Sequence, residues 1–292
     1  DQTSEPTVLP ITAAQPPTPA IVPNDAQDLA GIERGLRYEL WAKDETRQVN
    51  VIYPPSKTAV LSRDEKHYWV SLDELTTGKL IQRGISRGLD LELRGKRREG
   101  YGFRFDGLLR VPATGFYLIH MRGTDGYRIS IDGQQSLQWD GLHGPQPKTT
   151  ALHLAKGDHS LHLDYFVDRN KPFFQLEWEG PGLPRQDIPA KALFHHPESS
   201  LPIATIQVAT EASGKVDAKI VTDPKGHQIE KIDFFFDTMQ ISSAAGTKLD
   251  YSGVLPAGEH QLWARIYYDG ILTIDTPVQP IIIANQSLDH WN

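Results

Sequence analysis

Residues 115–144, GFYLIHMRGTDGYRISIDGQQSLQWDGLHG, decide the fold. Apolar side chains recur at every second position in 117–121 and again in 127–131, and Gly-Thr-Asp-Gly separates the two runs. Alternation with a period of two predicts β-strands, and a glycine-flanked turn between two such runs predicts a β-hairpin. Asp132 and Gly133 then predict a two-residue hairpin turn that leads into a third short strand.

The same alternation continues on both sides of this stretch. Further predicted strands share apolar residues at alternate positions and end at turn residues: 36–41, 101–111, 152–154, 161–165 and 174–178. A short helical turn is expected near residues 73–75. Strands separated by turn signals about every dozen residues indicate an all-β protein, built as an antiparallel sandwich or barrel and not from parallel α/β units.

Composition divides the chain into two folded units and two flanking segments. Residues 1–27 contain six prolines among Thr, Ala, Gln and Ser and predict an extended tether, with an ordered arm across a domain as the alternative. Residues 28–196 form the first predicted β-domain, and the Pro- and Ser-containing sequence at 195–200 predicts its boundary. Residues 197–286 predict a second all-β domain, and 287–292 a short tail.

The second domain is expected to be an immunoglobulin-like β-sandwich. About seven short alternating strands in about 85 residues suit that fold, although the chain has no cysteine for its signature disulfide. One short motif occurs in both domains, as LAKGDH at 154–159 and LPAGEH at 255–260. Each copy places a glycine before an acidic residue and a histidine, so we expect the same hairpin at both places.

Composition also excludes several classes of partner and chemistry. The net charge is −7, with acids and bases mixed along the chain, which argues against nucleic acid as a partner. No apolar run is long enough to span a bilayer, so no membrane insertion is expected. The absence of cysteine excludes disulfides, thiol catalysis and cysteine-ligated zinc.

No catalytic constellation is present in the sequence. Glu177 and Glu179 point to the same side of one predicted strand, so they cannot flank a substrate as a glycosidase pair would. A nucleophile elbow, a glycine-rich phosphate loop and a His-Glu-x-x-His element are all missing. His153 and His162 could lie side by side as metal ligands, but solvent-facing positions are the simpler interpretation. We therefore expect a non-catalytic protein.

The loop at 139–144, WDGLHG, combines the side chains of a sugar site. The Trp139 ring could stack on the apolar face of a sugar, and Asp140 and His143 could hydrogen-bond to its hydroxyls. The alternative is that Trp139 belongs to the core and Asp140 caps a turn. Asp125, in a predicted glycine-flanked turn, is either a turn residue that accepts backbone N–H groups or a contact for a ligand or metal.

A series of motifs resembles the PA-fourteen family, the β-barrel module first recognised in the anthrax protective antigen. The matching motifs, in order, are FRFDG at 103–107, VPATGFY at 111–117, TDG at 124–126, IDG at 131–133, WDGLHG at 139–144, LAKGDH at 154–159, WEGPG at 178–182 and IPAKALF at 188–194. The resemblance covers residues 36–194 and implies a lectin-like β-barrel of the kind found in bacterial glycosidases, toxins and cell-surface adhesins. The second domain looks like the immunoglobulin-like modules beside catalytic domains in exported bacterial glycoside hydrolases.

Calcium-dependent lectins of this family hold the ion with two consecutive aspartates, and sugar hydroxyls complete its shell. The matching pair here is Thr124 and Asp125, so a hydroxyl replaces one carboxylate and a charge is lost from the site. The resemblance therefore leaves Asp125 as a candidate calcium ligand, to which Asp140 from a nearby loop could contribute.

These observations favour a non-catalytic, exported carbohydrate-binding region of a bacterial surface or secreted protein. We expect a glycan or polysaccharide to bind over the loops 123–127 and 139–144, at Thr124, Asp125, Trp139, Asp140 and His143. The protein would be periplasmic, cell-surface or extracellular. The alternative is a structural or protein-docking module that braces an adjoining catalytic domain or partner protein, and a hidden hydrolase is the third hypothesis.

Overall fold

The computed structural model describes residues 20–22, 31–43, 69–168, 170–211, 213–246 and 250–283. Within these ranges the chain forms strands β1 to β20 and three short 3-10 helices, η1 (Leu72–Thr77), η2 (Leu91–Arg94) and η3 (Ala190–Ala192). The all-β prediction is confirmed, and η1 contains the expected helical turn. No helix in this part of the chain is both long and apolar enough to cross a bilayer. The predicted tail, and the predicted tether apart from 20–22, lie outside the described residues.

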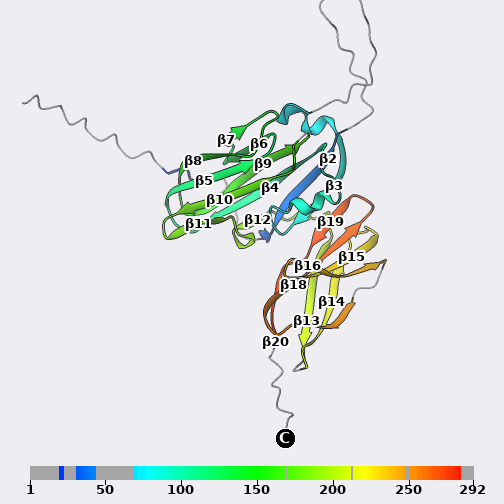
Figure 1. Cartoon of the computed structure of the whole chain (residues 1–292). Coiled ribbons are helices and arrows are strands. Elements are labelled where there is room, and N and C mark those ends of the chain that lie inside the picture. Colours follow the sequence, from blue (N-terminus) through cyan, green and yellow to red (C-terminus); the bar gives the residue numbers. More distant parts are fainter. Residues whose placement is uncertain are drawn as a thin grey trace, which may run out of the picture.

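The first unit is a sandwich of two antiparallel sheets (Figure 1). One sheet has the order β11 (Leu183–Asp187), β10 (Phe174–Gly180), β5 (Gly115–Gly123) and β8 (Gln146–Leu154). The facing sheet has the order β3 (Lys79–Ser86), β2 (Leu36–Ala42), β4 (Tyr101–Val111), β9 (Gly157–Val167), β6 (Tyr127–Ile131) and β7 (Gln134–Trp139). At one end, β12 (Leu193–His195) pairs with β4 and with β1 (Glu33–Arg34).

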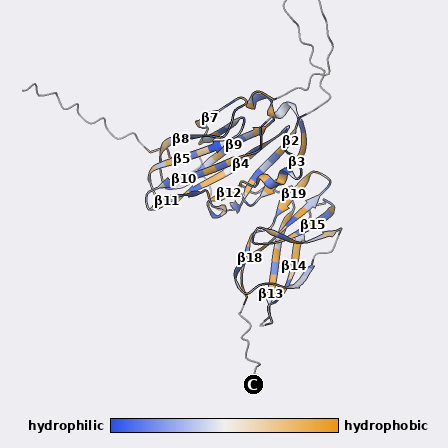
Figure 2. Ribbon diagram, viewed as in Figure 1, coloured by the Kyte–Doolittle hydropathy of each residue, from blue (hydrophilic) through white to orange (hydrophobic). Residues whose placement is uncertain are grey.

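The core of this unit lies between its two sheets. Tyr117, Ile119 and Met121 of β5 are buried, as the alternation predicts, and they cluster with Phe103 and Ile129 from the facing sheet. Figure 2 shows hydrophobic and hydrophilic residues interspersed along the same strands. The strands of this unit bury their apolar face against the facing sheet. This burial stabilises the fold by roughly 25 cal/mol for each Å² of apolar surface removed from water.

The predicted hairpin between residues 115–123 and 127–131 is wrong. β5 pairs with β8 and β10, whereas β6 pairs with β7 and β9, so the turn between β5 and β6 carries the chain from one sheet to the other. A Cβ atom on Gly126 would lie 2.1 Å from the Phe166 ring, because the backbone approaches the core closely at this corner. The two-residue hairpin at Asp132 and Gly133 is confirmed: both have positive φ, +50° and +73°, and they join β6 to β7.

The repeated Gly-acid-His motif also marks a crossing between sheets and not the expected hairpin. It joins β8 to β9 in the first unit, and β17 (Asp250–Val254) to β18 (Gly258–Tyr268) in the second. In each copy the histidine is held by an aspartate from another turn: His159 Nδ1 lies 2.6 Å from Asp132, and His260 Nδ1 lies 2.9 Å from Asp237. The other oxygen of each aspartate accepts the next backbone N–H, at 2.8 and 2.9 Å. The two units thus use one locking device twice.

The second unit also contains two layers of strands. One sheet has the order β13 (Ile203–Thr210), β14 (Lys215–Asp223) and β17. The other contains β16 (Met239–Ala245), β15 (Ile229–Phe236) and β18, with β19 (Leu272–Asp275) and β20 (Gln279–Ile283) both paired to β18. Buried residues from both layers form a second core, which includes Ile220, Phe234 and Ile266. The immunoglobulin-like assignment stays a prediction.

One sheet runs through both units without a break. β19 of the second unit pairs in parallel with β3 of the first, with Thr273 opposite Gly84, and Figure 1 shows these strands side by side. Arg83 N donates to Ile271 O at 2.8 Å, and the Tyr38 hydroxyl is hydrogen-bonded to that of Thr273. This backbone pairing joins the two units directly. One sheet of the second unit therefore continues the sheet of the first unit that contains β3.

Residues 20–22 lie against the first unit. Ile21 forms a parallel bridge with Leu154: its N–H donates to His153 O at 2.6 Å, and its carbonyl accepts from Ala155 N at 2.9 Å. Ile21 is therefore bound to the edge of the first unit, and the tether over residues 1–27 stays a prediction.

Candidate functional site

The two predicted loops meet at one end of the first unit. Asp125 N donates a hydrogen bond to His143 O at 2.9 Å, so the turn after β5 and the loop after β7 are directly joined. This end of the sandwich is also covered by a small cluster in which Trp69, Leu72 and Phe166 are buried and Leu142 packs against them. We call the loops 123–127 and 139–144 the tip.

Thr124 and Asp125 are buried at the tip, only 2% and 0% exposed. The Asp125 carboxylate accepts from Asp168 N at 2.9 Å and from Asn170 Nδ2 at 2.6 Å. The Thr124 hydroxyl accepts from Phe173 N at 3.0 Å. The Asp125 carboxylate thus accepts N–H groups, as the turn-residue interpretation expects. These N–H groups belong to Asp168 and Asn170, in the segment after β9, and not to the turn that contains Asp125. That these two residues contact a ligand stays a prediction.

Asp168 is a second buried carboxylate beside this turn, and the sequence analysis missed it. Lys43 Nζ lies 2.6 Å from Asp168 Oδ1, and Trp69 N donates to Oδ2. Burial raises the pKa of Asp168 and the nearby charge of Asp125 raises it further, while Lys43 opposes both effects. A polar Asp-Arg-Asn sequence directly after a strand was the available signal. Asp125 of the tip and Asp168 beside it are thus two carboxylates whose oxygens are largely used by donors of this chain.

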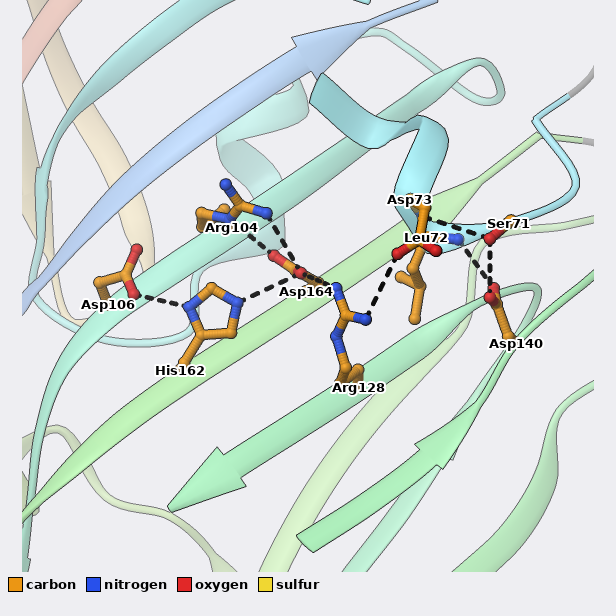
Figure 3. Close-up of polar contacts among 9 residues, drawn as sticks. All are labelled: Ser71, Leu72, Asp73, Arg104, Asp106, Arg128, Asp140, His162 and Asp164. Carbon is orange, nitrogen blue, oxygen red and sulfur yellow. Dashed lines mark hydrogen bonds and ion pairs between the residues drawn. The ribbon is translucent and has the colours of Figure 1, made fainter. Parts of the chain in front are cut away.

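The Asp140 carboxylate lies beside Gly126, the residue after Asp125, because a Cβ atom on Gly126 would lie 2.9 Å from Asp140 Oδ1. Its Oδ1 accepts from Leu72 N at 2.8 Å and from Gly141 N at 2.9 Å, and its Oδ2 accepts from Ser71 Oγ at 2.9 Å (Figure 3). The carboxylate therefore holds the start of η1 in place. Among the described residues, no group of three or more His, Cys, Asp or Glu is placed to hold a metal ion.

Trp139 and His143 form a stacked pair on the tip. Their ring centroids lie 4.1 Å apart with an interplanar angle of 19°, and both side chains are partly exposed. Lys148 Nζ lies 4.4 Å from the Trp139 ring, and Tyr127 meets both rings edge-on. Trp139 also packs against the main core, as the alternative interpretation expects. That Trp139 contacts a sugar stays a prediction. The pair is a rigid aromatic surface with an ammonium group beside it.

A charged network occupies the outer face of β4, β9 and β6 (Figure 3). The buried Asp164 carboxylate accepts from Arg104 and Arg128 and pairs with His162, whose other ring nitrogen lies 2.7 Å from Asp106. Hydrogen bonds to Asp106 and then to Asp164 raise the pKa of His162 to about 9, although burial opposes them. Burial would raise the pKa of Asp164, but its three cationic partners outweigh burial and hold it well below its usual range.

The other candidates from the sequence are structural. His153 lies in β8 and His162 in β9, on opposite sheets, so the two do not form a metal site. His153 instead stacks on Phe116, with ring centroids 4.5 Å apart. Glu177 pairs with Arg185 at 2.9 Å, and Glu179 lies 3.2 Å from His120.

The chain is similar to one protein family and to several solved structures. The PA14 domain model matches residues 86–192. A PA14 sugar-binding domain from an RTX adhesin is 18% identical, with a TM-score of 0.40, over 56% of this chain and 98% of that one. An epithelial adhesin domain from Candida glabrata, in complex with Galβ1-4GlcNAc, is 8% identical, with a TM-score of 0.42, over 59% and 94%. An anti-sigma factor domain-containing protein from Clostridium clariflavum is 13% identical, with a TM-score of 0.39, over 84% and 98%.

No curated protein matches the chain in sequence. The resemblance read from the motifs is nevertheless confirmed, because the matched residues 86–192 contain the tip and most strands of both sheets of the first unit. This chain contains a PA14 domain.

Proposed function

We propose that the chain is a non-catalytic, exported glycan-binding region that meets its sugar at the tip. PA14 domains often bind sugars. The observation that carries the proposal for this chain is the stacked, partly exposed pair of Trp139 and His143. Aromatic rings held by packing supply a flat apolar surface for the C–H face of a sugar at little cost in conformational entropy.

The tip residues divide into a contacting set and a supporting set. Trp139, His143 and Lys148 are partly or fully exposed and offer ring surface and hydrogen-bond donors. Thr124 and Asp125 are buried and hold the underlying segment through Phe173, Asp168 and Asn170, so their role in binding is to fix the loops. Preorganised loops lose less entropy when a ligand binds.

We propose binding without calcium. A calcium ion takes six to eight oxygen ligands, usually including several carboxylates. Here the Thr124 hydroxyl is hydrogen-bonded to Phe173, and the Asp125 carboxylate accepts from N–H donors, which use lone pairs that a cation would need. Asp140 is held at η1. The donor set of the tip therefore does not fit the ion in this arrangement.

The test is a glycan array followed by calorimetry, each with calcium and with chelator. We expect binding to a subset of neutral glycans, unchanged by chelator. Trp139→Ala should weaken it about tenfold or more, because a ring contact contributes roughly 1.5–3 kcal/mol. Phe116→Ala is the matched control, since Phe116 is 59% exposed in the same unit but lies on β5, outside the tip. Silence across the array, or equal binding by the two variants, would overturn the proposal.

A further inference from the structure

A groove lies between the end of β3 and the strands β10 and β11. It has a volume of about 670 Å³, which is within the range of small-ligand sites. One wall is formed by the segment 87–90, and the other by residues 173–176 and 187–190. It adjoins the tip, because Phe173 at its rim is hydrogen-bonded through its backbone to Thr124.

The lining combines an aromatic ring with planar polar groups. Phe173 is 37% exposed, and Gln175 and Asp187 present an amide and a carboxylate. Arg87 supplies a guanidinium that stacks over the Trp263 ring at 4.2 Å. Among the described residues, neither the Arg87 guanidinium nor the Asp187 carboxylate has a hydrogen-bond or ion-pair partner. Both charges are therefore available to a ligand.

The second unit holds one wall of this groove in place. Trp263 lies under the Arg87 guanidinium, and Arg265 Nη2 donates to Asp90 at 2.7 Å. Arg265 also forms a two-pronged pair with the buried Asp275, at 2.7 and 2.9 Å, and Asp275 accepts from Arg87 N at 3.2 Å. A domain that only separated its neighbours would not need these contacts with Arg87 and Asp90. The contacts instead fix the position of the two polar groups of the 87–90 segment.

We propose that this groove is a second saccharide site, which takes a neutral sugar unit of the glycan bound at the tip. Phe173 offers a ring face to the C–H side of a sugar, Arg87 and Gln175 donate to its hydroxyls, and Asp187 accepts from them. Of the charged lining residues in the described part of the chain, Asp90 is paired with Arg265, and the charges of Arg87 and Asp187 balance. A balanced lining suits an uncharged polyol better than a uronate. This site rests on the proposed glycan binding, and it makes the second unit a part of the binding surface.

The test separates this groove from the tip with four proteins. The groove variant is Gln175→Ala with Asp187→Ala, and the tip variant is Trp139→Ala. The matched control is Gln207→Ala with Asp250→Ala, because these are exposed residues of the same types on β13 and β17, far from the groove in sequence and sheet. The fourth protein is the unaltered chain. The probes are hexasaccharides of glucose, N-acetylglucosamine, mannose and galacturonate, measured by calorimetry, with urea midpoints to show that each variant folds.

We expect the groove variant to bind the best neutral hexasaccharide about tenfold more weakly than the control does, because the hydrogen bonds of two side chains to the sugar are lost. Its affinity for a disaccharide, which fills the tip alone, should not change. If the groove variant binds the hexasaccharide as the control does, the groove proposal is wrong while the tip stands. If the groove variant binds the hexasaccharide more weakly than the control, but the tip variant binds it as the control does, the groove proposal stands and the tip proposal fails. Preference for galacturonate, or no binding by the unaltered chain, overturns the groove proposal.

Discussion

Replacing Gly84 by alanine should separate the sheet that joins the two units. Gly84 has φ of +153°, and a Cβ atom there would lie 1.7 Å from Thr273 O and 2.7 Å from Thr273 C. Both are backbone atoms of β19, so no side-chain rotation relieves the clash. β3 and β19 would have to move apart by more than an ångström, and the pairing opposite Leu272, Thr273 and Ile274 would be lost.

The cost follows from two contributions. Two or three backbone hydrogen bonds at roughly 1 kcal/mol each are lost, and an alanine in this backbone conformation adds roughly 1–3 kcal/mol of strain. We therefore expect the free energy of unfolding to fall by about 3–6 kcal/mol, a large part of the 5–15 kcal/mol that is typical of a domain. The loss should be concentrated at the junction of the units.

The measurement is urea unfolding followed by circular dichroism, with hydrogen exchange of the Arg83 amide as a local probe. Gly95→Ala is the control, because Gly95 has φ of +61° but a Cβ atom there meets nothing within 4 Å. Its free energy of unfolding should fall only by the backbone strain, roughly 1–3 kcal/mol. Equal losses in the two variants, or an Arg83 amide that stays protected in Gly84→Ala, would refute the argument that β19 and β3 are locked together.

Two further predictions concern charged groups. The pKa of His162 rises from its ordinary value of 6.5 to about 9 in the fold, so its contribution is complete below pH 6.5 and is lost as the pH rises through 9. After allowance for the partial exposure of the ring, we expect a loss of about 1–2 kcal/mol between pH 6 and pH 9.5. The loss should be absent in His162→Gln, and an unchanged slope in that variant would contradict the assignment. Asp132→Ala should cost about 2–3 kcal/mol, because it leaves Nδ1 of the fully buried His159 ring without its carboxylate partner. Asp237→Ala should cost less at the more exposed copy of the same lock, where the Asp237 side chain is 47% exposed. Urea midpoints of the two variants check this, and an equal loss would show that burial does not set the strength of the lock.

Local chemistry was sufficient to predict the strands and some of the turns. Alternation placed Tyr117, Ile119 and Met121 in the core, because a strand with one buried face must repeat every second residue. Asp132 and Gly133 predicted their hairpin for an equally local reason, since a tight turn needs two residues that tolerate positive φ. The recurring Gly-acid-His motif correctly indicated a device used twice, although its geometry was misread.

The misreadings share one cause. Gly123 to Gly126 and the two Gly-acid-His turns look like hairpins, but each leads from one sheet to the other. A strand buries one apolar face whether it pairs with the preceding strand or joins the facing sheet. The alternation of apolar and polar residues is therefore the same in both cases. The partner of a strand is chosen by packing against residues far away in the chain, such as Phe166 against Gly126.

The amino-acid sequence alone therefore determined that this protein is all-β, where most of its strands lie, and that its motifs are those of a PA14 domain. The tertiary structure decided which strands share a sheet, that Asp125 binds the segment after β9 while Asp140 binds η1, and that β19 continues the first sheet. It also brought Arg87 of one unit onto Trp263 of the other. These features depend on contacts between residues distant in the chain, and such contacts leave no periodic signal in the sequence around either partner.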